Sequence, residues 1–490
     1  MRFIILAGLT CCHFSFDEHR AKHKDHFKDL NGMIETTVPA FMNELLLFFA
    51  SLQLSSPVQL AAMQMLGHLY IRQPPLALES KARAVMDRAF SSDSNGHKLQ
   101  VLRNFYDFLR ADTKRYAMRA KENKEQAREV DAKALVGDTG EMSEAGVGAS
   151  LMQTYLDRII DATFVSSAAT LRAAGFEVIS LVLEQGLAHP LKCVPALIAL
   201  STSSDPHIRS RALKLHQDLN FKYASFIHSR DIEGVRKAYE YQVQLRGRAE
   251  HVIGYDHCGE ARETTGRPVA FLQPLYTLLR SKRARRNDFL SLLVKIGDAD
   301  PGAIVGHSGA WQADVSFVRF VAENIAGLDF KYLDEVLHIA YQVSSIISST
   351  GHATEASVCV GILFILREFL KAHYGIAESK CAGYSPNDSS HARDKPVVWH
   401  GQNDQGRIDW STWPYAAKRM ESTADYSDQR ARFRLMMAAG SLAVAEERAS
   451  VAGENQSFGS HANGSGGSFT DDLVLNADEL EFLTGQLIDE

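Results

Sequence analysis

A short basic segment offers the clearest binding chemistry in this sequence. Residues 280–286, RSKRARR, hold five cationic side chains in seven positions: Arg280, Lys282, Arg283, Arg285 and Arg286. The apolar pattern of the following NDFLSLLVKI predicts a helix, and positive charge at a helix N-terminus opposes the helix dipole. Because helix stability does not explain the segment, we expect these side chains to contact the DNA backbone and to contribute little to folding. A nuclear-import signal and a solvated loop are the alternatives.

Catalytic and metal-binding motifs are missing from the sequence. It contains neither the GxxxxGK[ST] of a phosphate-binding loop nor the HExxH of a zinc protease. The segment GHSGAW around Ser308 lacks the G-x-S-x-G spacing of a serine nucleophile and follows no predicted strand. His257 and Cys258 are adjacent, and adjacent ligands rarely chelate one metal ion. We therefore predict no catalytic residue, no metal site and no cofactor, in a protein that is not an enzyme.

Residues 185–230 have the pattern of two helices joined by a tight turn. Asp205 followed by Pro206 is a typical N-cap and first helical residue, so the second helix should begin there. Its apolar residues form one stripe, flanked by Arg211 and Lys214, which we expect in solvent together with Arg209. The repeat positions that we assign to this helix are Ile208, Arg209, Ala212, Leu215 and Leu219.

The same stripe recurs elsewhere, each time with Ala or Gly at its second position. The copies begin at Val58, Leu171 and Val318, and the two best copies, at 171 and 208, lie 37 residues apart. Helix–turn–helix units of about this length, with a small residue at one place, are typical of HEAT repeats, which stack into a solenoid. We predict an all-α HEAT-repeat α-solenoid without a sheet. An ordinary helical domain whose amphipathic helices share a period is the alternative.

The charges are unevenly distributed along the chain. The net charge is −6, but residues 451–490 hold eight acidic side chains and no Lys or Arg, so the rest is near neutral. A near-neutral chain of this kind does not have the charge of a protein that coats nucleic acid along its length, although it can carry local basic patches. The six cysteines have no CxxC pair and no framework spacing, which indicates reduced thiols. No apolar run approaches the roughly 20 residues of a membrane span.

The first residues, MRFIILAGLTCCHFSFDEHR, have two interpretations. A signal peptide, with N-glycosylation sequons at Asn387, Asn455 and Asn463, would indicate a secreted enzyme or glycoprotein. However, the apolar run ends in Cys-Cys-His-Phe and continues directly into a charged amphipathic segment. We therefore favour a solenoid helix whose neighbours are missing, which would make this chain the C-terminal portion of a longer protein.

Composition and periodicity divide the chain into six segments. We expect HEAT-type helical repeats in 1–110, a charged helix and flexible linker in 111–150, further HEAT-type repeats in 151–375, an irregular segment in 376–413, a helix in 414–448 and a disordered acidic tail in 449–490.

Several segments resemble the sister-chromatid cohesion loader family, known as Nipped-B or adherin. The hairpin 185–230 and the stretch YSPNDSS that begins at Tyr384 are the most specific. Other matching segments follow in the family's order: AGLTCCHFSFD, KLQVLRNFYDFL, SLMQTYLDRIIDATF, RRNDFLSLLVKIGD and FVAENIAGLDFKYLDEVLHIAYQVSSIIS. The resemblance covers roughly residues 5–395 and identifies the C-terminal part of the family.

This resemblance implies a hook-shaped solenoid that acts in the nucleus, on chromatin, as a non-catalytic loading factor for cohesin. It implies contacts with double-stranded DNA, with the kleisin subunit and with the ATPase heads of the SMC subunits, promoting DNA capture and stimulating cohesin's ATPase. The family's N-terminal region, which holds a helical-repeat partner subunit, is absent here, so binding of that partner is doubtful. A generic HEAT-repeat scaffold or adaptor for another complex is the alternative function.

Overall fold

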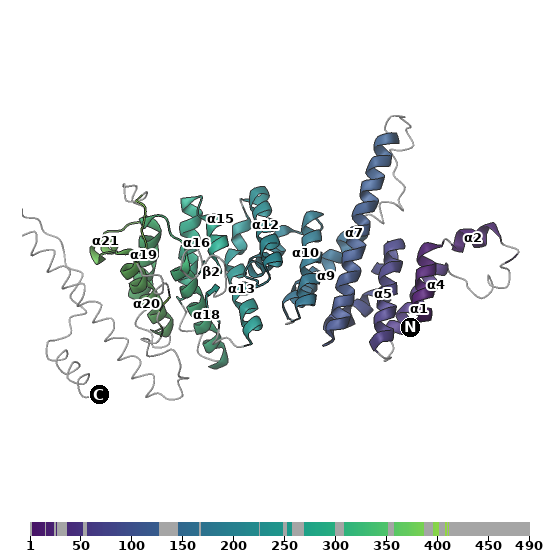
Figure 1. Ribbon diagram of the computed structural model, residues 1–490, viewed down its shortest axis with the longest axis horizontal. Helices are drawn as coiled ribbons and strands as arrows, with labels where there is room; N and C mark the ends of the chain where they lie inside the picture. Colours follow the sequence, from purple (N-terminus) through teal and green to yellow (C-terminus); the bar gives the residue numbers. More distant parts are fainter. Residues whose placement is uncertain are drawn as a thin grey trace, which may run out of the picture. The chain divides into compact units, whose positions relative to one another are not determined.

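Amphipathic helices that pack against their neighbours along the chain make up the structure, a computed structural model (Figure 1). The residues that it describes are 2–14, 16–23, 26, 37–51, 56–126, 146–165, 168–224, 226–247, 252–256, 269–298, 308–350, 357–386, 395–400, 407–408 and 410. The expected helix 414–448 and the expected tail 449–490 lie outside them. No helix in the described ranges is both long and apolar enough to cross a membrane.

The first group of helices packs around α5. Its elements are α1 (Arg2–His13), α2 (Phe16–Lys22), α4 (Val38–Ser51), α5 (Ser56–Arg72), η1 (Pro74–Leu78), α6 (Ser80–Ser91) and α7 (Asn95–Gln126). Helices α1, α4 and α7 all contact α5, whose stripe residues Ala62, Met65 and Leu69 are buried. Helix α7 continues through residue 110 without a break, so the charged sequence that follows extends an existing helix.

The second group contains the hairpin. Its elements are α9 (Val147–Val165), α10 (Ala169–Glu184), η3 (Pro190–Lys192), α11 (Val194–Leu200), α12 (Pro206–Tyr223), η4 (Ile227–Arg230) and α13 (Asp231–Arg246). All seven residues of α11 are buried, because this short helix lies between α12 and α13. The Asp205 carboxylate accepts hydrogen bonds from the backbone N–H groups of His207 and Ile208, which is the N-cap predicted from the sequence.

The third group completes the described helices. Its elements are β1 (Tyr255–Asp256), β2 (Val269–Ala270), α15 (Gln273–Leu279), α16 (Arg283–Lys295), α18 (Ser308–Gly327), α19 (Leu333–Thr350), α20 (Ser357–Tyr374) and α21 (Glu378–Ala382). Strands β1 and β2 form an antiparallel pair, so the expectation of no sheet is wrong in this detail. Helix α18 holds the pair: Glu323 accepts a hydrogen bond from the Gly254 N–H at 2.7 Å, and Asn324 accepts one from the Leu272 N–H at 2.9 Å.

Small residues lie where neighbouring helices cross. Ala62, Ala212 and Ala322 are at most 1% exposed. At Gly175 an added Cβ would lie 2.0 Å from Thr163 Oγ1, so α10 approaches α9 too closely for any side chain there. These crossings, together with the helix pairs, confirm the predicted all-α fold of HEAT type.

Candidate functional site

The basic segment 280–286 joins α15 to the first turn of α16. Arg280 follows the last residue of α15, Lys282 is the residue before α16, and Arg283 begins the helix. Among the described residues, no side chain caps the N-terminus of α16. The turn therefore presents cations at the helix end where the partial charge of the backbone is already positive. Carboxylates from another helix compensate for this charge.

Two of the five cations are paired with acidic residues in the first turn of α19. The Arg283 guanidinium donates two hydrogen bonds to Asp334, from Nε to Oδ2 at 3.0 Å and from Nη2 to Oδ1 at 2.9 Å. Arg286 donates to Asp334 as well, and to Glu335 Oε1 at 3.1 Å. Asp334 and Glu335 lie at the N-terminal end of α19, where the helix dipole favours negative charge. The segment thus attaches α16 to α19.

This ion-pair cluster is buried, which the sequence did not predict. The side chain of Arg286 is 5% exposed and that of Asp334 is 2% exposed. The expectation that the basic segment matters little for folding is therefore wrong for Arg286, because replacing it would leave the buried Glu335 without its ion-pair partner and would remove one of the two arginines that pair with Asp334. Burial by itself would raise the pKa of Asp334, but the hydrogen bond from Arg283 and the charges of Arg283 and Arg286 outweigh burial and lower that pKa.

The stretch that begins at Tyr384 reaches the same cluster from a distant part of the chain. The Tyr384 hydroxyl donates to Asp334 Oδ1 at 3.1 Å, and Arg283 Nη2 donates to the carbonyl oxygen of Pro386 at 3.4 Å. Burial, followed by the nearby Asp334 charge, raises the pKa of Tyr384, which keeps its hydroxyl protonated as a donor. Two stretches that stood out separately in the sequence therefore meet at one cluster.

The remaining three cations of the segment differ in their environments. Lys282 is exposed and has no ion-pair partner in the described part of the chain. Arg285 is half-buried, with Nη1 3.3 Å from His228 Nε2. Arg280 is half-buried, and its buried Nη1 has no hydrogen-bond partner among the described residues. Lys282 is thus the cation of the segment that is open to solvent.

A buried polar layer holds the hairpin to its neighbours. Arg172 donates from Nη1 to the Tyr241 hydroxyl at 2.9 Å, and that hydroxyl donates to Ser203 Oγ at 3.2 Å. Gln242 Nε2 donates to the carbonyl oxygen of Thr202 at 2.8 Å. These bonds join α10 and α13 to the turn between α11 and α12. No pattern in the sequence indicated these bonds, since the partners lie about 40 to 70 residues apart.

The repeat positions assigned to α12 are unequal in burial. Ile208 and Leu219 are 7% exposed and Ala212 is fully buried, whereas Leu215 is half-buried. Outside the stripe, Arg209 forms an ion pair with Asp256 at 3.3 Å, and Arg211 pairs with Glu177. Both arginines thus keep part of their side chains in solvent while pairing with a carboxylate, and Lys214 is exposed as expected.

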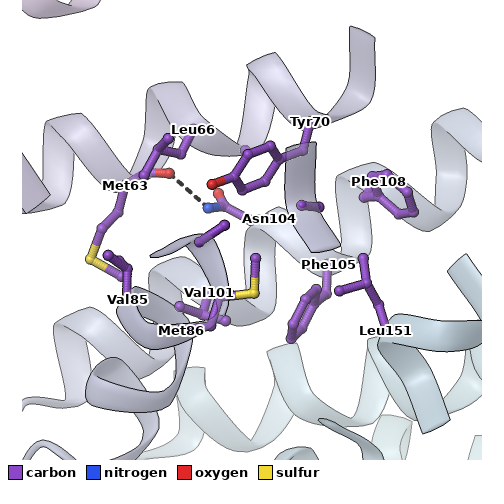
Figure 2. Close-up of a pocket in the computed structure, with 13 residues that line it drawn as sticks. Met63, Leu66, Tyr70, Val85, Met86, Val101, Asn104, Phe105, Phe108 and Leu151 are labelled. Atoms are coloured by element: carbon purple, nitrogen blue, oxygen red, sulfur yellow. Dashed lines mark hydrogen bonds between the residues drawn. The ribbon is translucent and has the colours of Figure 1, made fainter. Parts of the chain in front are cut away.

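An apolar cavity lies between α5, α6, α7 and α9 (Figure 2). Its volume is about 30 Å³, which suits about one water molecule and no larger ligand. Asn104 donates from Nδ2 to the carbonyl oxygen of Met63 at 2.8 Å, and the Tyr70 hydroxyl is buried without a hydrogen-bond partner among the described residues (Figure 2). The cavity is a gap in the core packing with no set of catalytic groups.

The other motifs considered in the sequence yield no site in the structure. Ser308 begins α18, and His257 and Cys258 lie outside the described residues. Within the described ranges, no group of three His, Cys, Asp or Glu side chains could hold a metal ion. Cys193 and Cys381 are buried thiols, and burial raises the pKa of Cys193 to about 12, so this thiol is unreactive at neutral pH.

Comparisons with known proteins point to one family. Residues 148–346 match the family model described as "Sister chromatid cohesion C-terminus", a range that contains the hairpin, the basic segment and Asp334. The chain is 28% identical over 353 residues to Nipped-B-like protein B of Danio rerio, and 27% identical over 353 residues to Nipped-B-like protein of Homo sapiens. Each alignment covers 72% of this chain and 11% of the relative, so this chain corresponds to a small part of those proteins.

Two fungal proteins extend the comparison. Sister chromatid cohesion protein mis4 of Schizosaccharomyces pombe is 23% identical over 346 residues, covering 64% of this chain and 20% of that protein. The structure of the C-terminal fragment of cohesin loader SCC2 from Chaetomium thermophilum superposes with a TM-score of 0.65 at 18% identity, covering 89% of this chain and 30% of that one. At this identity the likeness concerns the fold.

Proposed function

The chain belongs to the sister-chromatid cohesion loader (Nipped-B/SCC2) family, whose C-terminal part it matches, and we propose that it acts as a non-catalytic loading factor for cohesin. The observation that carries this proposal is the family match over residues 148–346, on a fold of the same kind. The partner is cohesin, contacted through its kleisin subunit and the ATPase heads of its SMC subunits. The site of action is chromatin in the nucleus.

A stack of helix pairs suits this function physically. Each pair exposes one face, so the stack offers an extended surface that can hold several partners at once. A protein of this kind can promote DNA capture and accelerate ATP hydrolysis by cohesin without catalytic residues of its own. It does so by holding the ATPase heads in a reactive arrangement, which supplies part of the activation free energy as binding free energy.

The DNA contact in this proposal lies at the basic segment. The geometry supports Lys282 as the main contact, with Arg285 and Arg280 beside it, because Lys282 is exposed and its charge is not balanced by a neighbour in the described part of the chain. Arg283 and Arg286 act within the fold, since their ion pairs with Asp334 and Glu335 hold the segment in place. Such contacts would be to phosphates and so independent of base sequence.

Reconstitution with purified cohesin tests the proposal. We expect the full chain to retain cohesin subunits in a pull-down, with and without DNA, and to raise the rate of DNA-stimulated ATP hydrolysis by cohesin. The same assay without cohesin should show no ATP hydrolysis. A chain that neither retains cohesin nor changes its ATPase rate would favour a general HEAT-repeat scaffold for another complex.

A further inference from the structure

Ser385 occupies a position between two residues that contact the ion-pair cluster. Its neighbour Tyr384 donates to Asp334 at 3.1 Å, and the carbonyl oxygen of its other neighbour, Pro386, accepts from Arg283 at 3.4 Å. Ser385 itself is exposed and lies outside any helix or strand. Its hydroxyl is therefore accessible to solvent while its backbone is held next to the N-terminus of α16.

The sequence around Ser385 is that of a protein-kinase substrate. A serine followed by proline is the minimal target of proline-directed protein kinases, and the chain has two such pairs, at Ser56 and Ser385. Ser56 is the first residue of α5 and so lies in a helix. Proline favours an extended backbone in the residue before it, which fits Ser385 outside any helix and makes it the more accessible substrate.

We propose that Ser385 is a phosphorylation site for a proline-directed kinase, and that its phosphate binds Lys282 and Arg283 at the N-terminus of α16. In the transfer, the Ser385 Oγ forms a bond to the γ-phosphorus of ATP while the bond from that phosphorus to the β,γ-bridging oxygen breaks. ADP leaves with that oxygen, and the hydroxyl proton passes to the kinase's carboxylate base.

The basic side chains at the start of α16, which reaches the Pro386 carbonyl oxygen through Arg283, can accept a phosphate. Arg283 and Arg286 are balanced by the two carboxylates of Asp334 and Glu335. Lys282 is exposed and has no ion-pair partner in the described part of the chain, so its positive charge is in excess. The N-terminus of α16 adds backbone N–H groups that no side chain in the described part of the chain caps. A phosphoserine brings a charge of about −1.5 to −2 and three acceptor oxygens, and next to an Arg cluster it forms charge-assisted hydrogen bonds.

Phosphorylation would also change the surface of the basic segment. Because the phosphate would cover Lys282, it would remove the exposed cation that the proposed function assigns to DNA; this consequence, unlike the site itself, rests on that function. The sequence then contains both a DNA-binding segment and the serine that would switch it off.

Phosphorus NMR of the phosphorylated full chain tests the site without reference to DNA. After treatment with a proline-directed kinase and ATP, mass spectrometry should place phosphate on Ser385, and the Ser385→Ala chain should lack the corresponding signal. We expect the second pKa of that phosphate, about 6 in a free phosphoserine, to lie about one unit lower than in a peptide spanning residues 380–390. Lys282→Ala should restore roughly half of the difference, whereas Lys295→Ala, an exposed lysine at the other end of α16, should restore none.

The outcomes separate the site from the proposed function. No phosphate on Ser385, or a phosphate that titrates as in the peptide, would overturn the proposed site. A lowered phosphate pKa that reverts in Lys282→Ala but not in Lys295→Ala supports it, whatever the DNA affinity. DNA binding is then measured on the same samples: a chain that binds no DNA before phosphorylation argues against the DNA contact alone, and leaves the NMR result for the site unchanged.

Discussion

The Asp334 carboxylate accepts two hydrogen bonds from the Arg283 guanidinium, from Nε at 3.0 Å and from Nη2 at 2.9 Å. This pair joins the start of α16 to the start of α19. Arg286 and Tyr384 donate to the same carboxylate. One buried side chain thus holds three segments that are about 50 residues apart in the sequence. A buried charge of this kind is costly when its partner is removed, because the remaining ion stays in a medium of low dielectric constant.

Replacing Asp334 should therefore destabilise the fold. We expect Asp334→Ala to lower the free energy of unfolding by about 3 kcal/mol or more, since it leaves Arg286 buried with Glu335 as its only carboxylate partner in the described cluster. Urea denaturation followed by circular dichroism measures this change. The matched control is Asp288→Ala, an exposed carboxylate on α16, which should change the free energy by about 0.5 kcal/mol or less. Equal effects of the two substitutions would show that the cluster does not hold α16 to α19.

The pH dependence of stability should depend on His216. This side chain is 2% exposed on α12, and burial, with a smaller effect of His228, lowers its pKa from 6.5 to about 4. As the pH falls from 6.5 towards 4, the unfolded chain binds a proton at this position and the folded chain does not, so stability is lost in that window. The loss amounts to roughly 3 kcal/mol, or about 1.4 kcal/mol for each unit of pKa difference.

Variants of the same helix measure this contribution. Denaturation midpoints at pH 7.5 and pH 4.5 should differ less in His216→Gln than in the original chain, because glutamine does not titrate. His207→Gln, an exposed histidine in the first turn of α12, should keep the original difference. If the two variants keep the same pH dependence, protonation of His216 does not contribute to acid destabilisation.

The close crossing of α10 and α9 should not tolerate a methyl group. Gly175→Ala adds a Cβ 2.0 Å from Thr163 Oγ1, and overpacking of this kind costs about 1–3 kcal/mol. Gly96→Ala, in the first turn of α7, adds a Cβ whose nearest neighbour is 3.6 Å away, and should be neutral or stabilising by up to about 1 kcal/mol. Thermal denaturation of both variants compares them. A melting temperature of Gly175→Ala equal to or above that of Gly96→Ala would contradict the close approach of α10 to α9 at Gly175.

Local patterns in the sequence were sufficient to predict the helices. The Asp205 cap and the start of α12 at Pro206 depend on neighbours within a few positions, and the structure has them as expected. The small residues recur at one place in the apolar stripe, so the period was enough to predict their burial. The stripe residues of α12, at positions 208, 212, 215 and 219, are spaced by four, three and four residues, and this period predicted a buried Leu215. The structure buries His216 more deeply. A histidine carries no apolar signal, so its burial depends on the packing of neighbouring helices and cannot be predicted from periodicity.

Contacts between distant segments could not be predicted in this way. A dense run of arginines indicates an exposed binding surface when it is considered alone, yet the partners of Arg283 and Arg286 follow about 50 residues later in α19. Neither Asp334 nor Glu335 forms a motif with them in the sequence. Similarly, nothing in YSPNDSS indicates that Tyr384 contacts α19. Only the packing of α16, α19 and α21 brings these residues together.

The proposed DNA contact should be visible in the salt dependence of binding. Each phosphate that a cation neutralises contributes about −0.9 to the slope of log affinity against log salt concentration. We expect Lys282→Ala combined with Arg285→Ala to flatten this slope by about one to two units, equally on duplexes of unrelated sequence, because contacts to phosphates carry no base information. Lys295→Ala removes an exposed cation from the other end of the same helix and should leave the slope unchanged.

Arg283 and Arg286 are kept in this experiment, because their loss would disturb the cluster around Asp334, and an effect on folding could then be mistaken for an effect on DNA binding. A nuclear-import signal predicts the opposite result: the double variant would bind DNA with an unaltered slope and accumulate in the cytoplasm. Identical slopes for the original chain and the double variant would exclude the basic segment as a DNA contact.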